Sequence, residues 1–271
     1  MTTAFADNPI AFSRLTNGYW QIWQINPDGT DLKQLTVTAY DKRDPVWTGK
    51  NGQFAYRTHN GELFIFDPVS GFEQQILKEY GQINNPVFVP QTGEVIFVRF
   101  DPRSIDICDL WKAQSDGKNA VMLTQDRILK YQPAASPDGK SIAYVKTSST
   151  SKDHTIWLMD LASKDIKPLV EESGYNTHPD FSPDGSFLTY TSNRDGNYEI
   201  YLKDLKSAQD KRLTSDPQLD TSASISPDGR STVFVSNRGG NRQLWIMDTD
   251  GNNVRQLTTG DNPADDPAWK K

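Results

Sequence analysis

Short apolar segments, each about four residues long and bounded by polar turn residues, recur along the whole chain. A run of this length with few polar positions is typical of a β-strand that is buried on both faces. Each run is followed by a turn and a second strand centred on an aromatic residue, and no long segment has the 3.6-residue period of a helix. The apolar segments are residues 10–13, 54–57, 95–98, 142–145, 187–190 and 233–236.

These strands belong to a unit that is repeated six times. Ser-Pro-Asp-Gly precedes three of the apolar strands, at residues 136–139, 182–185 and 226–229. It predicts a tight turn, because Pro presets φ, Asp bonds the local backbone and Gly takes the left-handed position. Repeats of about 40 to 45 residues are typical of four-stranded propeller blades. The units are 41 to 47 residues apart when aligned on Asp44, Asn85, Gln132, His178, Ser222 and Asp266.

We therefore predict an all-β fold, a six-bladed β-propeller of four-stranded blades that forms a single domain over residues 1–271. The chain starts at a second strand, and residues 266–269 match the innermost strand 44–47. This last strand is expected to complete the first blade and close the ring, which removes open sheet edges, so loss of the last eight residues should open it. The predicted blades are 266–269 with 10–36, 44–77, 85–124, 132–170, 178–214 and 222–258.

Two further positions are aligned in the repeats. A Leu-Thr pair closes four of the units and predicts their outermost strands, at residues 35–36, 123–124, 213–214 and 257–258. In the other two units the outermost strands are predicted at residues 75–77 and 168–170. The third strands carry an aromatic residue at one position, and packing between adjacent blades is favoured there over an exposed ligand platform. The aromatic residues expected in the core are Trp23, Phe64, Trp111, Trp157, Tyr201 and Trp245.

The innermost strands of a propeller line a central channel, and their side chains alternate in direction. The aligned residue and the one two places later should face the channel, and the next should point into the sheets. This predicts an entirely polar upper ring of Asp44, Asn85, Gln132, His178, Ser222 and Asp266. The lower ring is Val46, Val87, Ala134, Asp180, Ser224 and Ala268, and the buried positions are Trp47, Phe88, Ala135, Phe181, Ile225 and Trp269. The upper ring and Asp180 are the predicted partner-binding residues.

The upper ring suggests two kinds of chemistry. Asp44 and Asp266 lie on neighbouring blades and could bind Ca²⁺, but calcium takes about six to eight oxygen ligands and no dedicated loop motif is present. A hydrated polar channel mouth is therefore favoured, with no cofactor. His178 and Asp180 could form a catalytic pair, although a simple hydrogen-bonded pair is favoured.

Two long connections are candidates for recognition, at residues 99–109 and 146–154. Both are expected on the face where the ring opens. The second is equally well interpreted as an insertion without a role.

Charge and cysteine content limit the possible partners and compartments. The formal net charge is −6 and the basic residues are scattered, which argues against nucleic acid or anionic lipid as a partner. Cys108 is the sole cysteine, so no internal disulfide can form. Residues 1–9 contain neither a signal peptide nor a membrane span. Either the protein is cytoplasmic, or Met1 replaces a removed leader.

Residues 179–202 resemble the blades of the TolB family, in their Pro-Asp-Phe-Ser-Pro-Asp-Gly, Ser-Asn-Arg-Asp-Gly-Asn and Ile-Tyr-Leu segments. The resemblance extends from about residue 10 to 269. It implies a propeller that binds partner proteins, in the periplasm of bacteria, within an envelope system that links the inner membrane to a peptidoglycan-associated lipoprotein. The family's N-terminal α/β domain has no counterpart in this sequence, so the expectation carried over is binding through the propeller. The blades also resemble those of dipeptidyl peptidases and some sugar lyases.

We expect a non-enzymatic, monomeric scaffold that receives a loop or peptide of a partner protein at the channel mouth. A hydrolase would need a Gly-x-Ser-x-Gly nucleophile motif and a second domain. A metal-dependent lyase would need converging histidines, but His59, His154 and His178 fall in different blades. The alternative is a small-molecule or carbohydrate-processing enzyme with acid/base chemistry in the channel, by Asp44, His178, Asp180 or Asp266. A strongly perturbed carboxylate in a closed channel would favour the enzyme, and a shallow wet mouth the scaffold.

Overall fold

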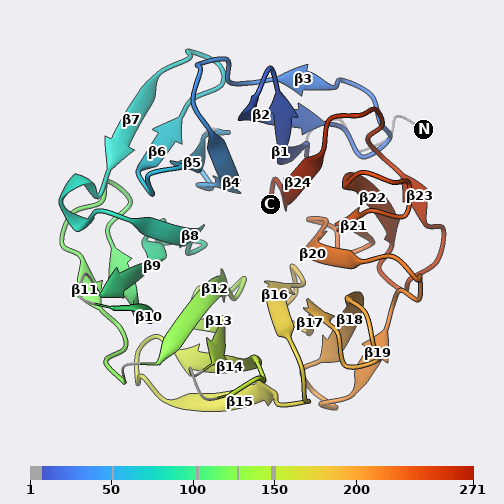
Figure 1. Ribbon diagram of the computed structural model, residues 1–271. Coiled ribbons are helices and arrows are strands. Elements are labelled where there is room, and N and C mark those ends of the chain that lie inside the picture. Colours follow the sequence, from blue (N-terminus) through green and yellow to red (C-terminus); the bar gives the residue numbers. More distant parts are fainter. Residues whose placement is uncertain (1–7, 51, 102–103, 127, 148–150) are drawn as a thin grey trace.

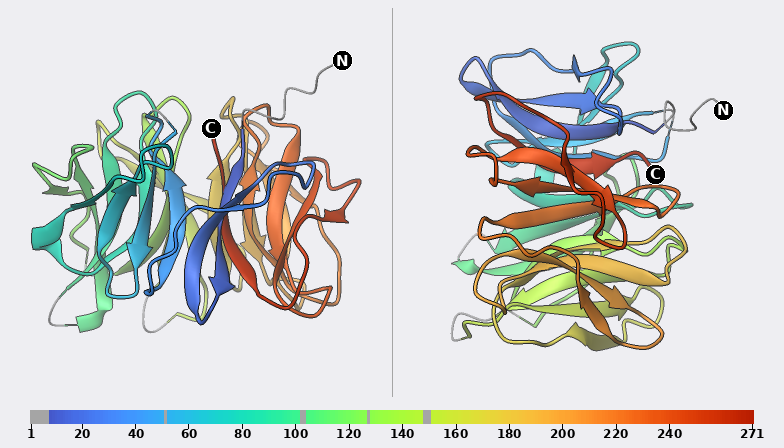
Figure 2. Two further views of the ribbon diagram at one scale, coloured as in Figure 1. Left: turned by 90° about the horizontal axis from the view of Figure 1, so that it is seen from above. Right: turned by 90° about the vertical axis from the view of Figure 1, so that its right-hand side faces the viewer.

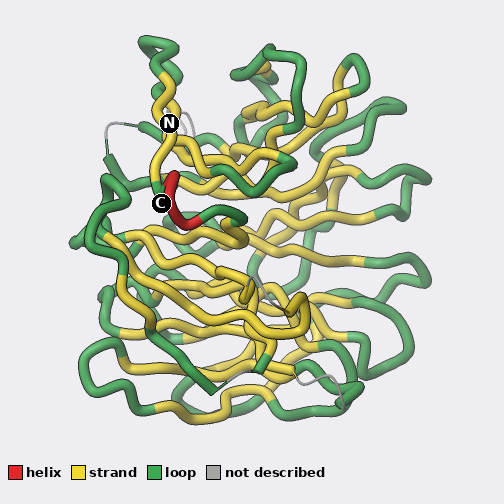
Figure 3. The backbone as a smooth tube through the Cα atoms, turned by 60° about the vertical axis from the view of Figure 1, so that its left-hand side comes forward, coloured by secondary structure: helices red, strands yellow, loops and turns green. Residues whose placement is uncertain are grey.

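The computed structural model describes residues 8–50, 52–101, 104–126, 128–147 and 151–271. They form six four-stranded antiparallel sheets, arranged like blades around a central axis (Figure 1). The six-bladed propeller predicted from the repeats is confirmed. Among these residues the one helical element is a single 3-10 turn, η1 (Lys78–Tyr80), drawn in red in Figure 3. No described helix is both long and apolar enough to cross a membrane.

Each blade runs from the axis outward through four strands. The innermost strands are β4 (Lys42–Trp47), β8 (Ile83–Phe88), β12 (Leu129–Ala135), β16 (Asn176–Phe181), β20 (Asp220–Ile225) and β24 (Ala264–Trp269). The second strands are β1 (Ile10–Thr16), β5 (Phe54–Thr58), β9 (Val95–Asp101), β13 (Ser141–Thr147), β17 (Phe187–Ser192) and β21 (Ser231–Ser236). The third strands are β2 (Tyr19–Ile25), β6 (Leu63–Phe66), β10 (Ser104–Ala113), β14 (Thr155–Asp160), β18 (Glu199–Asp204) and β22 (Gln243–Asp248). The outermost strands are β3 (Lys33–Gln34), β7 (Glu73–Ile76), β11 (Val121–Met122), β15 (Ile166–Val170), β19 (Asp210–Arg212) and β23 (Arg255–Gln256).

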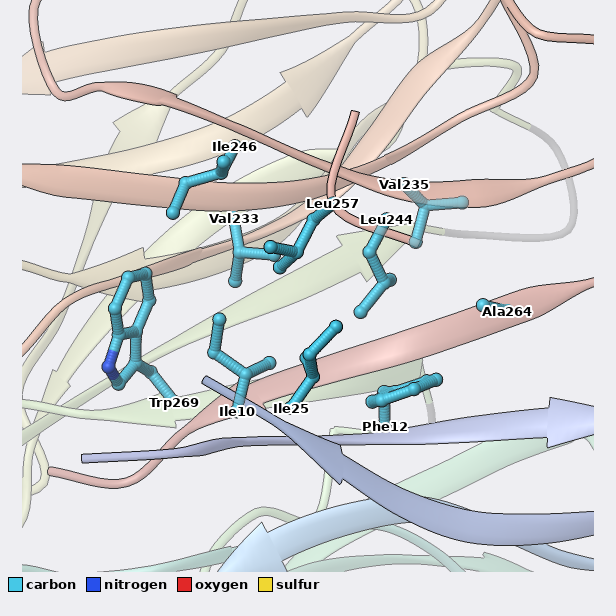
Figure 4. Packing of buried hydrophobic residues seen from close by; sticks show 10 residues of the cluster. All are labelled: Ile10, Phe12, Ile25, Val233, Val235, Leu244, Ile246, Leu257, Ala264 and Trp269. Carbon is cyan, nitrogen blue, oxygen red and sulfur yellow. The ribbon is translucent and has the colours of Figure 1, made fainter. Parts of the chain in front are cut away.

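The ring is closed by the C-terminal strand, as the repeat predicted. β24 pairs antiparallel with β1, with Ile10 opposite Trp269, so the first blade has the order β24-β1-β2-β3. An apolar cluster joins this blade to the sixth, and Trp269 is 3% exposed within it (Figure 4). Six such clusters are present among the described residues, and each lies between two adjacent blades. Burial between blades, therefore, holds the ring together.

The aligned aromatic residues are only partly in the core, which corrects the sequence prediction. Tyr201 is buried, but Trp23, Phe64, Trp111, Trp157 and Trp245 are half-buried, although they pack against the apolar clusters. In five blades a cationic side chain lies over the ring, which is a favourable cation–π arrangement and covers the aromatic face. These pairs are Arg14–Trp23, Arg99–Trp111, Lys146–Trp157, Arg194–Tyr201 and Arg238–Trp245.

The closing Leu-Thr pairs lie just beyond the outermost strands, where the sequence placed the strands themselves. In four blades the threonine Oγ1 accepts a hydrogen bond from an amide N–H of the third strand and donates one to a side chain of that strand. We call this arrangement the threonine clasp. Its members are Thr36 with Ile22 and Gln21, Thr124 with Leu110 and Asp109, Thr214 with Ile200 and Glu199, and Thr258 with Leu244 and Gln243. The motif is thus a side-chain lock between the last two strands of a blade.

The propeller has two faces that carry different connections (Figure 2). Turns from first to second strands lie on one face, which we call the turn face, and the chain ends there. The opposite face, which we call the loop face, carries the connections from second to third strands. The predicted recognition segments 99–109 and 146–154 belong to the loop face, but residues 102–103 and 148–150 lie outside the described residues. Residues 99–101 and 104–109 extend β9 and β10, so the first segment is mainly a hairpin.

Candidate functional site

A pocket of about 470 Å³ lies on the axis, between the innermost strands. A volume of this size is within the range of ligand-binding pockets. It is lined by all the residues that the sequence predicted for the site, namely Asp44, Asn85, Gln132, His178, Asp180, Ser222 and Asp266.

The backbone is left-handed at all six upper-ring residues, which simple alternation did not predict. Their φ values are 53° at Asp44, 43° at Asn85, 48° at Gln132, 51° at His178, 55° at Ser222 and 53° at Asp266. A break in strand register occurs at the same place in every innermost strand, as expected for a β-bulge. The recurrence of Asp, Asn and His, which tolerate positive φ, was the sequence signal for this conformation.

The bulge explains why the upper ring is polar. In four blades the amide N–H of the ring residue donates to a polar side chain of the preceding blade. His178 N donates to Gln132 Oε1 at 2.9 Å, and Gln132 N to Asn85 Oδ1 at 3.3 Å. Asp44 N donates to Asp266 Oδ2 at 3.4 Å, and Ser222 N to Thr191 Oγ1. These side chains satisfy buried backbone groups and join neighbouring blades, so the ring has a structural role.

The bulge also affects the residues predicted to point into the sheets. Phe88, Phe181, Ile225 and Trp269 are buried as expected. Trp47 and Ala135 are half-buried, and each of them lines the pocket together with Phe88 and Trp269. The wall below the upper ring is therefore more apolar than the sequence suggested.

Two arginines neutralise the carboxylates of the ring. Arg57 Nε lies 2.5 Å from Asp44 Oδ2, and Arg43 bridges Asp266 at 3.1 Å and Asp265 at 3.2 Å. Sequence reasoning missed Arg57. In each blade, an aromatic residue of the second strand lies opposite the aligned aromatic residue of the third strand, and Arg57 is the next residue along the second strand of its blade. The equivalent residues of the other blades are Ser13, Val98, Val145, Thr191 and Val235.

Burial raises the pKa of Asp44 to about 6, and the nearby charge of Asp266 acts in the same direction. Arg57 and Arg43 oppose this effect. Burial also lowers the pKa of His178 to about 4, so this imidazole is neutral at neutral pH.

His178 and Asp180 have separate partners and do not form the predicted pair. Nε2 of His178 accepts a hydrogen bond from the Gln132 amide at 2.6 Å, and Nδ1 lies 3.1 Å from Thr177 Oγ1. The Asp180 carboxylate instead accepts from Ile225 N at 2.8 Å and binds the ammonium of Lys271. Neither a catalytic dyad nor a simple His–Asp hydrogen bond is therefore present between these two residues.

The pocket extends from the upper ring toward the turn face. Its lining includes Thr48, Gly49, Val89, Pro90 and Lys271 on that side, and none of the residues that immediately precede the ring. The sequence placed the mouth on the face shared with the long connections, which is the loop face. In the structure the pocket extends mainly on the other side of the ring, where the turns between first and second strands surround it.

The calcium hypothesis gains no support from the site. The carboxylates of Asp44 and Asp266 each have an arginine partner. Within the described part of the chain, no group of three or more His, Cys, Asp or Glu side chains is arranged to hold a metal ion. His59 is exposed at the end of its blade, and His154 contacts Tyr131 and Tyr175 away from the pocket.

Comparison with known proteins gives matches of two kinds. Residues 102–271 match the family model of the TolB β-propeller domain. The Tol-Pal system protein TolB of Alcanivorax borkumensis is 32% identical over 38% of this chain and 24% of its own length. Dipeptidyl-peptidase 5 of Porphyromonas endodontalis is 29% identical over 69% of this chain. This chain spans only 28% of that peptidase.

The structural comparison agrees on the fold. The crystal structure of TolB from Acinetobacter baumannii has a TM-score of 0.85, at 21% sequence identity. The match covers 99% of this chain and 67% of that chain. At this level of identity the likeness concerns the fold alone.

Proposed function

The chain belongs to the family of the TolB β-propeller domain, and from this premise we propose that it is a non-enzymatic scaffold that binds a partner protein. The central pocket would receive a loop or peptide of the partner through its mouth on the turn face. As part of this proposal we place the protein in the periplasm, within a bacterial envelope system, as the resemblance to TolB implies. We expect it to act as a monomer.

The observation that supports binding is the division of the pocket into two levels. At its inner end, hydrogen bonds and the Arg43–Asp266 ion pair join ring side chains to neighbouring blades, and Asp44 pairs with Arg57 of its own blade, which makes this level rigid. Nearer the mouth, the wall is formed by small and apolar side chains such as Val46, Val87 and Ala134, with one carboxylate, Asp180. Apolar walls with few fixed polar groups are typical of sites that recognise a ligand by shape and orientation.

A single substitution in this wall tests the proposal. Val46→Lys fills the pocket with a long charged side chain but removes no hydrogen bond, so the fold should survive. Val37→Lys is the matched control, because Val37 is 81% exposed and lies outside the pocket. Circular dichroism first verifies that both variants fold.

The measurement is affinity capture from an extract of the source cell, with identification of the retained proteins. A protein retained by the wild type and by Val37→Lys, but lost by Val46→Lys, supports binding in the pocket. Retention by all three proteins contradicts it, and so does retention by none.

A second candidate is a small-molecule or carbohydrate-processing enzyme. Its support is the raised pKa of Asp44, which lies near 6 and would suit acid/base chemistry. The similarity to the peptidase supports only the propeller fold and not an enzymatic activity, since this chain covers 28% of the peptidase. Turnover of a small substrate that is abolished by Asp44→Asn, in a variant that still folds, would favour the enzyme over the scaffold.

A further inference from the structure

Asp180 forms a preorganised cation-binding site on the pocket wall, near the turn face. Its Oδ2 atom accepts the amide N–H of Ile225 at 2.8 Å, which fixes the carboxylate. Lys271 Nζ lies 2.7 Å from Oδ1 and 2.9 Å from Oδ2, and donates to the carbonyl oxygen of Phe181 at 3.0 Å. One ammonium group therefore has three oxygen acceptors that belong to β16.

The remaining charged groups of the pocket are committed to the ring. Asp44 pairs with Arg57, and Asp266 pairs with Arg43. At the lower ring the other blades carry Val46, Val87, Ala134, Ser224 and Ala268. Asp180 is thus the one lower-ring carboxylate, and its cationic partner comes from outside the ring.

Lys271 reaches this point from a different blade. It follows β24 of the first blade, and the preceding residue is held by a hydrogen bond from Lys270 N to the carbonyl oxygen of Pro9, just before β1. The chain end lies close to the axis in Figure 1 and on the turn face in Figure 2. The side chains of Asp180 and Lys271 are 23% and 39% exposed, so the contact can exchange with solvent and with a competing cation.

We propose that Asp180 and the Phe181 carbonyl recognise a lysine or arginine side chain of the partner segment, and that Lys271 occupies this subsite until the partner displaces it. The inference rests on the proposed function, because it specifies the ligand of the same pocket. The net charge of −6 favours approach of a basic segment. Because Lys271 belongs to the same molecule, its ammonium group competes with the partner for Asp180 at an effective concentration of about millimolar. The partner can therefore displace Lys271 reversibly.

Peptide binding tests the subsite directly. The probes are acetyl-Gly-Gly-Lys-Gly-Gly-amide and the same peptide with norleucine in place of lysine, which has a similar length but no charge. Binding is followed by NMR through the indole N–H signals of Trp47 and Trp269, which line the pocket. The proteins compared are the wild type, Lys271→Gln, Asp180→Asn and Lys270→Gln.

The variants are chosen to separate charge from position. Lys271→Gln frees the subsite, and we expect it to bind the lysine peptide about three- to tenfold more tightly than the wild type. Lys270→Gln removes an equal charge from the neighbouring residue, whose ammonium lies 5.7 Å from the Trp47 ring, and should leave the affinity unchanged. Asp180→Asn keeps an oxygen acceptor for Ile225 N, but should abolish the preference for lysine over norleucine.

Two outcomes would overturn the subsite: equal affinity of the wild type and Lys271→Gln for the lysine peptide, or equal affinity of Lys271→Gln for both peptides. If none of the proteins binds either peptide detectably, the wild type and Lys271→Gln do not differ, and the subsite is overturned as well. The proposed function fails separately, in the capture experiment with Val46→Lys. If Val46→Lys loses a partner that Asp180→Asn and Lys271→Gln retain unchanged, the scaffold stands and the cation subsite is wrong.

Discussion

Replacing Thr258 by valine should destabilise the propeller although the two side chains have nearly the same shape. Thr258 is buried, and its Oγ1 accepts a hydrogen bond from Leu244 N at 2.9 Å and donates one to Gln243 Oε1 at 2.7 Å. Valine leaves the Leu244 N–H without this acceptor in a buried position. Because an unsatisfied buried donor costs about 1–3 kcal/mol, we expect the free energy of unfolding to fall by about 2 kcal/mol.

The same substitution at Thr214 should cost more. Its hydroxyl donates at 2.6 Å to a buried carboxylate, Glu199 Oε2, where Thr258 donates to a neutral amide. Hydrogen bonds to charged groups contribute about 1.5–3 kcal/mol. The other carboxylate oxygen keeps its bonds to Arg212 and to the Asp216 amide, so the site should not collapse. We expect a loss of about 3 kcal/mol for Thr214→Val.

Equilibrium urea unfolding followed by tryptophan fluorescence measures both effects, from the shift in midpoint at constant m-value. Serine at each position is the matched control, because it keeps the hydroxyl and removes only a methyl group, which costs about 1 kcal/mol. If valine costs no more than serine at both positions, the threonine clasp contributes no stability and the reasoning is refuted.

Two further predictions concern ring closure and the ring carboxylates. Trp269→Ala should lower the free energy of unfolding by about 3–5 kcal/mol, because the side chain is buried in the cluster that joins the first and sixth blades. A loss below about 1 kcal/mol in urea unfolding would contradict this role. Because burial raises the pKa of Asp44 from 3.8 to about 6, the folded protein binds more protons than the unfolded chain between these pH values, and stability falls as pH rises through this interval. The stability of Asp44→Asn relative to the wild type should therefore increase from pH 4 to pH 7, and parallel unfolding curves across this range would exclude the shift.

The geometry of the candidate site could be read from the sequence only in part. Each ring position was found, because the polar residue recurs at the same place in every repeat. Its conformation was not, since alternation along a strand assumes regular pairing, and the bulge interrupts it at each ring residue. The side of the ring on which the pocket mainly extends was not found either, because the sequence does not show how the space along the axis is filled.

The sequence by itself determined the number of blades, their order and the closure of the ring. These follow from local signals, namely tight turns and apolar strands at a nearly constant spacing, and each repeat must bury its faces against similar neighbours. The pairs that shape the site depend instead on contacts between distant residues. Arg57 meets Asp44 from the neighbouring strand of the same blade, Arg43 of the second blade meets Asp266 of the first, and Lys271 meets Asp180 from another blade. Only the tertiary structure brings these charges together, because no spacing along the chain determines which side chains meet once strands and blades pack against one another.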